Sequence, residues 1–214
     1  MENKQKLFIG IDLGGKTKKT TGVCILKDQK IVLIKDVIGG SLLKIINPYL
    51  KETKVIAIDA PLTKGKGKGL MRLYEKFLSK GIFRKEKVSP IPPALMPEFR
   101  NFALEIVEKL AEKGFSLGIN LIETFPTLIR KICKESFGKT NSSFKNENQE
   151  SAFLCAEIAL LHSQFKSRWL GYKDGFLFLP EMSFWKPEWR KIFYQAWRER
   201  ERLKYHHLIT NLWS

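Results

Sequence analysis

Three apolar segments of this chain each end in an acidic side chain. They are residues 7–12 (LFIGID), 54–59 (KVIAID) and 117–123 (LGINLIE), and a Gly or Pro follows each within three residues. Short apolar runs bounded in this way are typical of buried β-strands. A carboxylate at the end of such a strand is costly to bury unless a partner or a metal ion stabilises it. The pattern therefore predicts a sheet that collects acidic side chains at its strand ends.

Further strands and helices are expected between and after these segments. Strands are predicted over residues 20–26 and 30–37, so that with 7–12 they make an antiparallel meander. After a possible N-cap at Ser41, helices are predicted over 42–50, 70–79, 98–113, 127–136 and 148–165, with a last strand over 175–179. Residues 63–69 and 138–145 are expected to be polar loops, and 81–97 a long loop or lid. This order predicts an α/β fold with a mixed β-sheet flanked by helices.

The chain is expected to have one main domain and an extension. Residues 1–180 carry all the predicted strands, whereas residues 181–214 are aromatic and basic and predict a C-terminal helical extension packed on that domain. In the extension, Trp189, Phe193 and Trp197 lie four residues apart. That spacing favours core packing or a dimer contact over base stacking.

Residues 10–17 (GIDLGGKT) match the pattern of a phosphate-binding P-loop, G-x-x-x-x-G-K-[ST]. A P-loop needs its strand to end before the first Gly and a helix to begin at the Lys. Here Gly10 lies inside the apolar run, and the residues after Lys16 include Thr20, Thr21 and Val23, which favour a strand. The turn is therefore expected to join two strands. Asp12 becomes the residue of interest, either as a cation ligand or as a side chain that hydrogen-bonds its own glycine turn.

The net charge of +16, with a pI of about 9.8, favours an anionic partner, above all nucleic acid. The alternative is a lysine-rich surface balanced by acidic networks, but only 22 acidic residues face 38 basic ones. No apolar run approaches the roughly 20 residues that span a bilayer, and the N-terminus does not resemble a signal peptide. We therefore expect a cytoplasmic protein with no membrane partner. The three cysteines lack C-x-x-C spacing and are expected to be buried and reduced.

Five carboxylates form the candidate site. Asp12, Asp59 and Glu123 end strands, and Glu147 and Glu150 are three residues apart at the start of a helix, so they share one face. Taken singly, each has a structural explanation, such as a cap or a favourable place at a helix N-terminus. Converging carboxylates, however, repel one another unless cations lie between them. Two Mg²⁺ (or Mn²⁺) ions held in this way would suit hydrolysis of a phosphodiester.

An ordered set of motifs resembles a known family. The motifs are GIDLGG…TTGV, AIDAPLT, R-x-x-[DE] at residues 72–75, IETFPT, E-x-x-E-[SA]-A-x-x-C-A at 147–156, and DGFLFLP. Together they resemble the predicted RNase H-like nuclease family, catalogued as domain of unknown function four-two-nine. The first motif is also similar to that of Holliday-junction resolvases. The resemblance covers residues 7–180 and leaves out the C-terminal extension.

The resemblance implies a ribonuclease H-like mixed β-sheet and a metal-dependent nuclease. Asp12, Asp59, Glu123 and Glu150 are then the candidate catalytic metal ligands, with Glu147 as a neighbour or substitute. The family's helix motif is usually written D-x-x-D-A, and this chain has Glu at both acidic positions and Ser151 in place of the first Ala. The candidate contacts to a nucleic-acid backbone are Lys16, Lys64, Lys66, Lys68 and Arg72, although the three loop lysines are equally well explained as a solvated loop.

Two other functions stay open. One is a ribonuclease H-like module that binds nucleic acid without cutting it, which the Glu-for-Asp exchanges favour. The other is an ATP phosphotransferase of the actin and sugar-kinase superfamily, whose first strand and turn the GIDLGG motif also resembles. Against the second, the chain has no further Gly-rich adenosine motif and about half the expected length. Oligomeric state and substrate structure are not indicated by the sequence.

Overall fold

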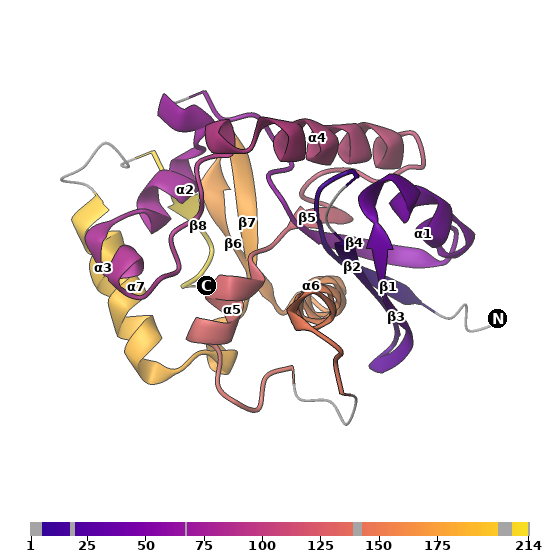
Figure 1. The fold of residues 1–214 in the computed structure, drawn as a ribbon. Coiled ribbons are helices and arrows are strands. Elements are labelled where there is room, and N and C mark those ends of the chain that lie inside the picture. Colours follow the sequence, from indigo (N-terminus) through magenta and orange to yellow (C-terminus); the bar gives the residue numbers. More distant parts are fainter. Residues whose placement is uncertain (1–5, 18–19, 67, 139–142, 201–206, 214) are drawn as a thin grey trace.

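The computed structural model describes residues 6–17, 20–66, 68–138, 143–200 and 207–213. Within them, eight strands form one sheet in the order β3-β2-β1-β4-β5-β7-β6-β8 (Figure 1). The strands are β1 (Leu7–Asp12), β2 (Thr20–Lys27), β3 (Lys30–Ile38), β4 (Thr53–Asp59), β5 (Leu121–Glu123), β6 (Ser167–Tyr172), β7 (Gly175–Pro180) and β8 (Ile209–Thr210). The predicted meander is present, because β1 pairs antiparallel with β2 and β2 antiparallel with β3.

The centre of the sheet is parallel. Strand β1 runs parallel to β4, β4 to β5 and β5 to β7, whereas β6 runs antiparallel to both β7 and β8. Because β1, β4 and β5 point the same way, their carboxyl ends meet at one edge of the sheet. The predicted fold class, an α/β mixed sheet flanked by helices, is confirmed.

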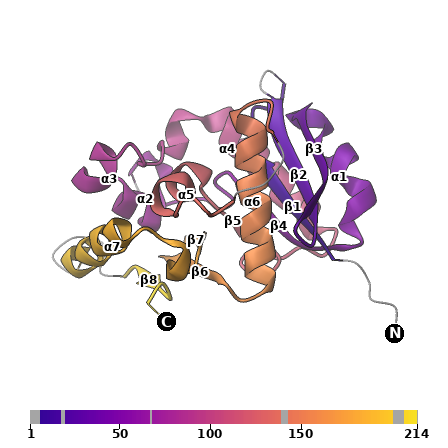
Figure 2. The ribbon, with the colours of Figure 1, turned by 90° about the horizontal axis from the view of Figure 1, so that it is seen from below.

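Helices cover both faces of the sheet. They are α1 (Leu42–Leu50), α2 (Leu73–Leu78), α3 (Gly81–Lys85), α4 (Pro97–Ala111), α5 (Pro126–Ile132), α6 (Glu147–Ser163) and α7 (Pro187–Glu199). On one face, side chains of α1 and α4 pack with Ile9, Ile11 and Ile58. On the other face, α5, α6 and α7 share a second buried cluster with Phe8 and Ala57 (Figure 2). Successive side chains of β1 and β4 thus point alternately into two cores, one on each side of the sheet.

Two glycines let α6 lie directly on the sheet. A Cβ on Gly10 of β1 would stand 2.0 Å from the carbonyl oxygen of Ala152, and one on Gly22 of β2 would stand 2.2 Å from that of Asn148. Both distances are far inside van der Waals contact, so these positions require glycine. Backbone atoms of α6 therefore contact Gly10 and Gly22 directly. This close contact brings the N-terminus of α6 beside the end of β1.

Several boundaries differ from the sequence prediction. Of the strand expected over 117–123, only Leu121–Glu123 is regular, because the preceding residues form a turn in which the backbone N–H of Asn120 donates to the carbonyl of Ser116. The helix expected over 70–79 is Leu73–Leu78, and the loop expected over 81–97 contains α3. Strands β6 and β8 were not predicted. Residues 139–142 of the expected loop lie outside the described residues.

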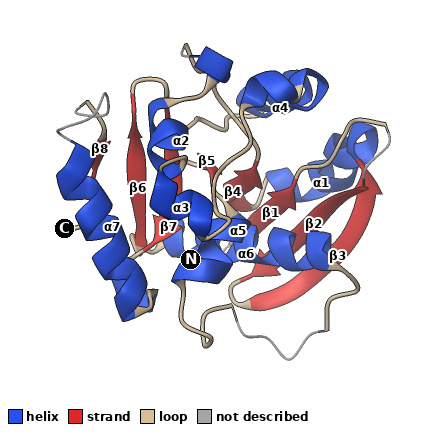
Figure 3. Cartoon of the chain, turned by 60° about the vertical axis from the view of Figure 1, so that its left-hand side comes forward, coloured by secondary structure: helices blue, strands red, loops and turns tan. Residues whose placement is uncertain are grey.

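The aromatic extension packs into the main core. Trp189 and Phe193 are buried beside Trp185, and Trp197 packs against the same cluster, so the core-packing interpretation of their spacing is confirmed. Figure 3 shows α7 beside the sheet edge formed by β6 and β8. Residues 201–206 of the predicted terminal helix lie outside the described part of the chain. The three cysteines are buried and free, as expected. Among the described helices, none has the length and apolar character to cross a membrane.

Candidate functional site

Asp12 and Asp59 form the centre of the candidate site. Each is the last residue of its strand, and the two are direct partners in the parallel register of β1 and β4. Paired residues on neighbouring strands point to the same face of a sheet and lie about 5 Å apart at Cα. Among the described residues, neither carboxylate has a hydrogen-bond or salt-bridge partner.

The β1–β2 connection also settles the P-loop question, because β1 continues through Gly10 to Asp12 and β2 begins at Thr20.

A third aspartate, which the sequence analysis did not single out, lies in the same row. Asp12 pairs with Gly22, and Gly22 pairs with Asp36 of β3. The Asp36 Oδ2 atom accepts hydrogen bonds of 2.9 Å from the side-chain amides of Asn146 and Gln149. Its Oδ1 atom is buried and has no hydrogen-bond partner among the described residues. Asp36 thus holds the start of α6 above the row formed by Asp12, Gly22 and Asp36. Its place in that row follows from the strand register and not from a local sequence pattern.

The N-terminus of α6 contributes the two glutamates. The Asn146 side chain caps the helix by accepting the backbone N–H of Gln149 at 3.1 Å. Glu147 and Glu150 lie in the first turn of the helix, and each is 3.4 Å from the guanidinium of Arg130 on α5. Arg130 also donates a 2.6 Å hydrogen bond to Ser151. Arg130 is a second residue that the sequence analysis missed, since nothing in the sequence of α5 indicates which helix it faces.

The electrostatics of the site match this arrangement. Burial raises the pKa of Asp12 to about 6, opposed by Arg130 and reinforced by Glu147 and Asp36. Burial raises the pKa of Asp59 well above its usual range, and the nearby charges of Asp12 and Glu123 raise it further. Two carboxylates with raised pKa values bind protons readily when no other cation is present. A divalent cation would replace those protons.

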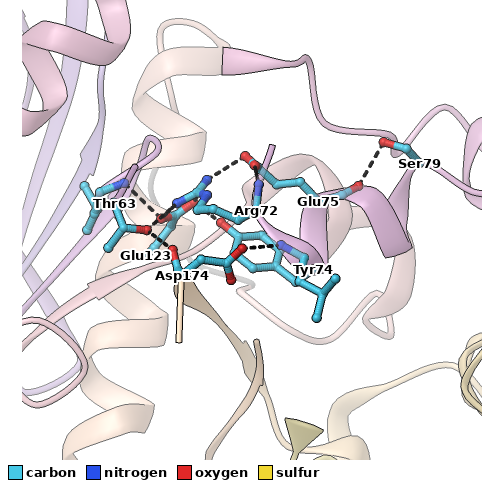
Figure 4. Close-up of polar contacts among 9 residues, drawn as sticks. Thr63, Arg72, Tyr74, Glu75, Ser79, Glu123 and Asp174 are labelled. Atoms are coloured by element: carbon cyan, nitrogen blue, oxygen red, sulfur yellow. Dashed lines mark hydrogen bonds and ion pairs between the residues drawn. The ribbon is translucent and has the colours of Figure 1, made fainter. Parts of the chain in front are cut away.

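Glu123 is engaged elsewhere (Figure 4). It lies in register with Ile58, one residue before Asp59. Its Oε1 atom accepts a 2.7 Å hydrogen bond from Arg72 and one from the Tyr74 hydroxyl, and its Oε2 atom accepts from Arg72 and, at 3.0 Å, from the backbone N–H of Leu62. Both carboxylate oxygens are therefore occupied by protein donors.

The network around Glu123 holds three chain segments together. Arg72 also donates to Glu75 at 2.6 Å, and Asp174, in the β6–β7 turn, accepts the backbone N–H of Leu73 at 2.9 Å (Figure 4). Thr63 donates a 2.6 Å hydrogen bond to the carbonyl of Asp174. Burial opposes the charge on Arg72, but Glu123 and its neighbours raise the pKa of Arg72 well above its usual value. The network is a buried, charged clamp between β5, α2 and the β6–β7 hairpin.

The five basic residues expected to contact nucleic acid differ in their exposure. Arg72 was expected to contact a nucleic-acid backbone, but its side chain is only 1% exposed and is held by two carboxylates. Lys64 and Lys66 are exposed on the loop after β4, and Lys68 is exposed at the first position of η2 (Lys68–Leu70). Lys16 is also exposed and forms a 2.7 Å salt bridge with Glu105. These four lysines therefore remain accessible, whereas Arg72 does not.

A cavity of about 820 Å³ opens beside the two aspartates. Asp12, Asp59 and the Gly14–Gly15 turn line one side of it. The opposite wall is mostly apolar and comes from the segment before α4, which supplies Pro90, Ile91, Pro93, Leu95 and Met96. The expected lid thus forms one wall of the cavity. A polar end against an apolar wall is the usual character of a small-molecule or substrate site.

The site suits a divalent cation only in part. Asp12 and Asp59 offer unpartnered oxygens, but in the described part of the chain no three His, Cys, Asp or Glu side chains are grouped so as to hold a metal ion. Mg²⁺ is often held by one or two carboxylates, with water and substrate phosphates completing its shell. The aspartate pair fits that mode. Of the other carboxylates expected in the cluster, Glu123 is held by Arg72, and Glu147 and Glu150 are paired with Arg130.

No protein-family model matches the chain, and neither a curated protein nor a solved structure matches it. The resemblance of the motifs to ribonuclease H-like nucleases therefore stays a prediction.

Proposed function

We propose that this protein is a metal-dependent hydrolase of phosphodiester bonds in nucleic acid. The observation that carries the proposal is the pair Asp12 and Asp59, whose carboxylates lack partners among the described residues and which line the 820 Å³ cavity in direct register. The motif resemblance to RNase H-like nucleases and the net charge of +16 support the same substrate class.

In this proposal Asp12 and Asp59 hold Mg²⁺ or Mn²⁺, and Glu150 and Glu147 close the site from α6. A bound ion supplies an activated water and neutralises charge on the phosphate. Glu123 is left out of the ligand set, because protein donors occupy both of its oxygens. The ligand set therefore differs from the one that the family resemblance implies.

The remaining residues bind and orient the substrate. Lys16 lines the cavity, and Lys64, Lys66 and Lys68 are exposed on the loop that follows β4, so these side chains are placed to contact phosphates. Arg130 holds Glu147 and Glu150 by ion pairs, and the charges of Arg130 and Glu147 also act on Asp12. The apolar wall at residues 90–96 excludes water from the side of the cavity away from the charges.

The test has a binding arm and a cleavage arm. Mn²⁺ should raise the melting temperature of the wild type, and labelled DNA and RNA oligonucleotides should be cleaved only when the metal is present. Asp12→Asn and Asp59→Asn should remove both effects. Asp28→Asn is the matched control, because Asp28 is an exposed aspartate in the turn between β2 and β3. Equal Mn²⁺ stabilisation in wild type and Asp12→Asn would refute the metal site.

A second candidate is a nucleic-acid-binding module without catalysis. The observation in its favour is Arg130, whose guanidinium already neutralises the two α6 glutamates without a metal ion. For such a module, oligonucleotide binding should weaken steeply with salt and should not change when Mn²⁺ or a chelator is added. Stabilisation by ATP alone would instead favour the phosphotransferase alternative.

A further inference from the structure

A second groove lies on one face of β5, β7 and β6, where α4 does not cover the sheet. Its volume is about 830 Å³. Leu62 and Leu121, from the core under α1 and α4, line it together with Phe178 from the core under α6, so the groove lies where the two cores meet. Its other lining side chains are mainly aromatic and aliphatic, and they include Phe165, Trp169, Phe176 and Ile119.

Aromatic rings are gathered on this face by strand register. Trp169 of β6 pairs with Phe178 of β7, and Gly171 pairs with Phe176, so these positions share one side of the sheet. The rings of Trp169 and Phe176 meet edge to face, with centroids 5.2 Å apart. Both side chains stay partly exposed. The Phe176 ring and the carbonyl oxygen of Gly175 lie directly over Gly171, where a Cβ would stand 2.6 Å and 2.3 Å from them.

Phe165 is held in a conformation that costs stability. It follows α6 directly, has a φ of +60°, and its side chain is 89% exposed. That place at a helix C-terminus normally belongs to glycine, because a Cβ makes the left-handed region unfavourable by about 1 kcal/mol. Across the groove, Ile119 is 71% exposed. Two large apolar side chains thus stand in solvent at the rim, one of them on a strained backbone, and such strain collects at functional positions.

The charges around the groove are positive. Lys173 is exposed and lines the groove, and Lys166, which follows Phe165 in the chain, is exposed as well. Of the nearby carboxylates, Glu123 is bound by Arg72, Glu181 lies 3.5 Å from Arg168, and Asp174 accepts the backbone N–H of Leu73. An anionic ligand with flat apolar surfaces complements this combination, whereas a plain apolar ligand leaves the lysines unused.

We infer that this aromatic groove binds single-stranded nucleic acid, with unpaired bases stacked on Phe165, Trp169 and Phe176 and phosphates held by Lys166 and Lys173. Base stacking on exposed rings is tolerant of sequence and requires bases that are not paired in a duplex. The inference deepens the proposed function and rests on it for the class of polymer. It adds that the substrate is, at least in part, single-stranded.

The groove is also linked to the candidate active site. Glu123 lines both cavities, and Thr63, at the groove, begins the loop that carries Lys64, Lys66 and Lys68. Since Glu123 is shared, a strand bound in the aromatic groove would lie next to the cavity that contains Asp12 and Asp59. The groove would therefore hold the strand away from the point of cleavage.

The test measures binding in the absence of metal. Fluorescence anisotropy of a labelled oligothymidylate, with a blunt duplex of equal length for comparison, is recorded in chelator at low ionic strength. The wild type should prefer the single strand. Trp169→Ala and Phe165→Gly should each weaken binding about 5-fold or more, since one stacked base contributes about 1–3 kcal/mol. Tyr194→Ala on α7 removes an exposed aromatic away from the groove and should change nothing.

Phe165→Gly separates binding from folding. Glycine relieves the strained backbone, so this variant should melt at a higher temperature than the wild type while it binds the oligonucleotide less well. Unchanged affinity in Phe165→Gly and Trp169→Ala, or equal affinity for duplex and single strand, overturns the inference. So does a dimer that dissociates in Phe165→Gly, because a second copy would then occupy the groove. Binding without metal is read separately from Mn²⁺-dependent cleavage, so the two proposals can fail independently.

Discussion

Asp12 and Asp59 are direct partners in the register of two parallel strands, and both end their strands on the same side of the sheet. Burial raises the pKa of each, and the charge of Asp12 raises the pKa of Asp59 further. Folding therefore places two carboxylates where their charged forms are unfavourable. Stability is lost at this site unless a proton or a cation is bound.

The pH dependence of folding should report Asp12 directly. Its pKa rises from 3.8 in the unfolded chain to about 6 in the fold, so the protonated form is favoured in the folded state. The stabilising contribution is complete below the unfolded pKa and is lost as pH rises through about 6. Asp12→Asn has no such loss. Near neutral pH the variant should be more stable than the metal-free wild type by up to about 3 kcal/mol.

Urea unfolding of both proteins in chelator, followed from acidic to neutral pH, checks this prediction. The difference between the two free energies of unfolding should grow between about pH 4 and pH 6. Added Mn²⁺ should narrow it at neutral pH, because the metal stabilises only the wild type. A difference that is constant with pH would show that Asp12 titrates normally in the fold.

Asp36 is predicted to fix the start of α6. Asp36→Ala removes the acceptor of two 2.9 Å hydrogen bonds, from Asn146 and Gln149, and should destabilise the fold by about 1–3 kcal/mol. Amide hydrogen exchange should become faster in the first turn of α6 and stay unchanged near its C-terminus. Lys35→Ala, at the neighbouring position of β3, is the control. Uniformly faster exchange along α6 would contradict the local role of Asp36.

Much of the fold could be predicted from the sequence, because local patterns decided it. Strand β1 and helix α1 have the predicted bounds, because a glycine turn follows β1 within two residues and the polar residues 51–53 follow α1 directly. Strand β6 was missed because SRWLGY mixes charged and aromatic residues directly after a helix. It exists through its antiparallel pairing with β7, which is a long-range contact that no local pattern encodes.

The candidate site was predicted in its types of residue but not in its grouping. Asp12 and Asp59 lie together because β1 and β4 are neighbours, as expected for strands that end at one edge. Glu123 also ends a strand, but its carboxylate pairs with the guanidinium of Arg72. This pairing depends on where α2 lies in the fold, which the sequence does not indicate. Asp36 and Arg130 lie at unremarkable places in the sequence. Register and helix packing bring them to the site.

The Arg72–Glu123 pair should be strongly coupled. Arg72→Met leaves the buried carboxylates of Glu123 and Glu75 without their cation and should cost about 3–5 kcal/mol. Adding Glu123→Gln removes one of the stranded charges, so the double variant should recover part of the loss. Urea unfolding of the wild type, both single variants and the double variant measures the coupling. Additive effects would show that the pair contributes no interaction energy.

The glycine contact between β1 and α6 gives a prediction with an internal control. In Gly10→Ala the new Cβ would meet the backbone of α6 at 2.0 Å, and backbone cannot rotate away as a side chain can. The helix must shift off the strand, which should cost about 3 kcal/mol or more and move Glu147, whose charge acts on Asp12, away from it. In Gly81→Ala the new Cβ meets nothing within 4 Å, and because alanine favours helix the change should stabilise α3 by up to about 1 kcal/mol. Unfolding free energies of the two variants should therefore change in opposite directions, and Mn²⁺ should stabilise Gly81→Ala as it does the wild type. Equal stability of the two variants would mean that α6 does not rest on β1 at Gly10.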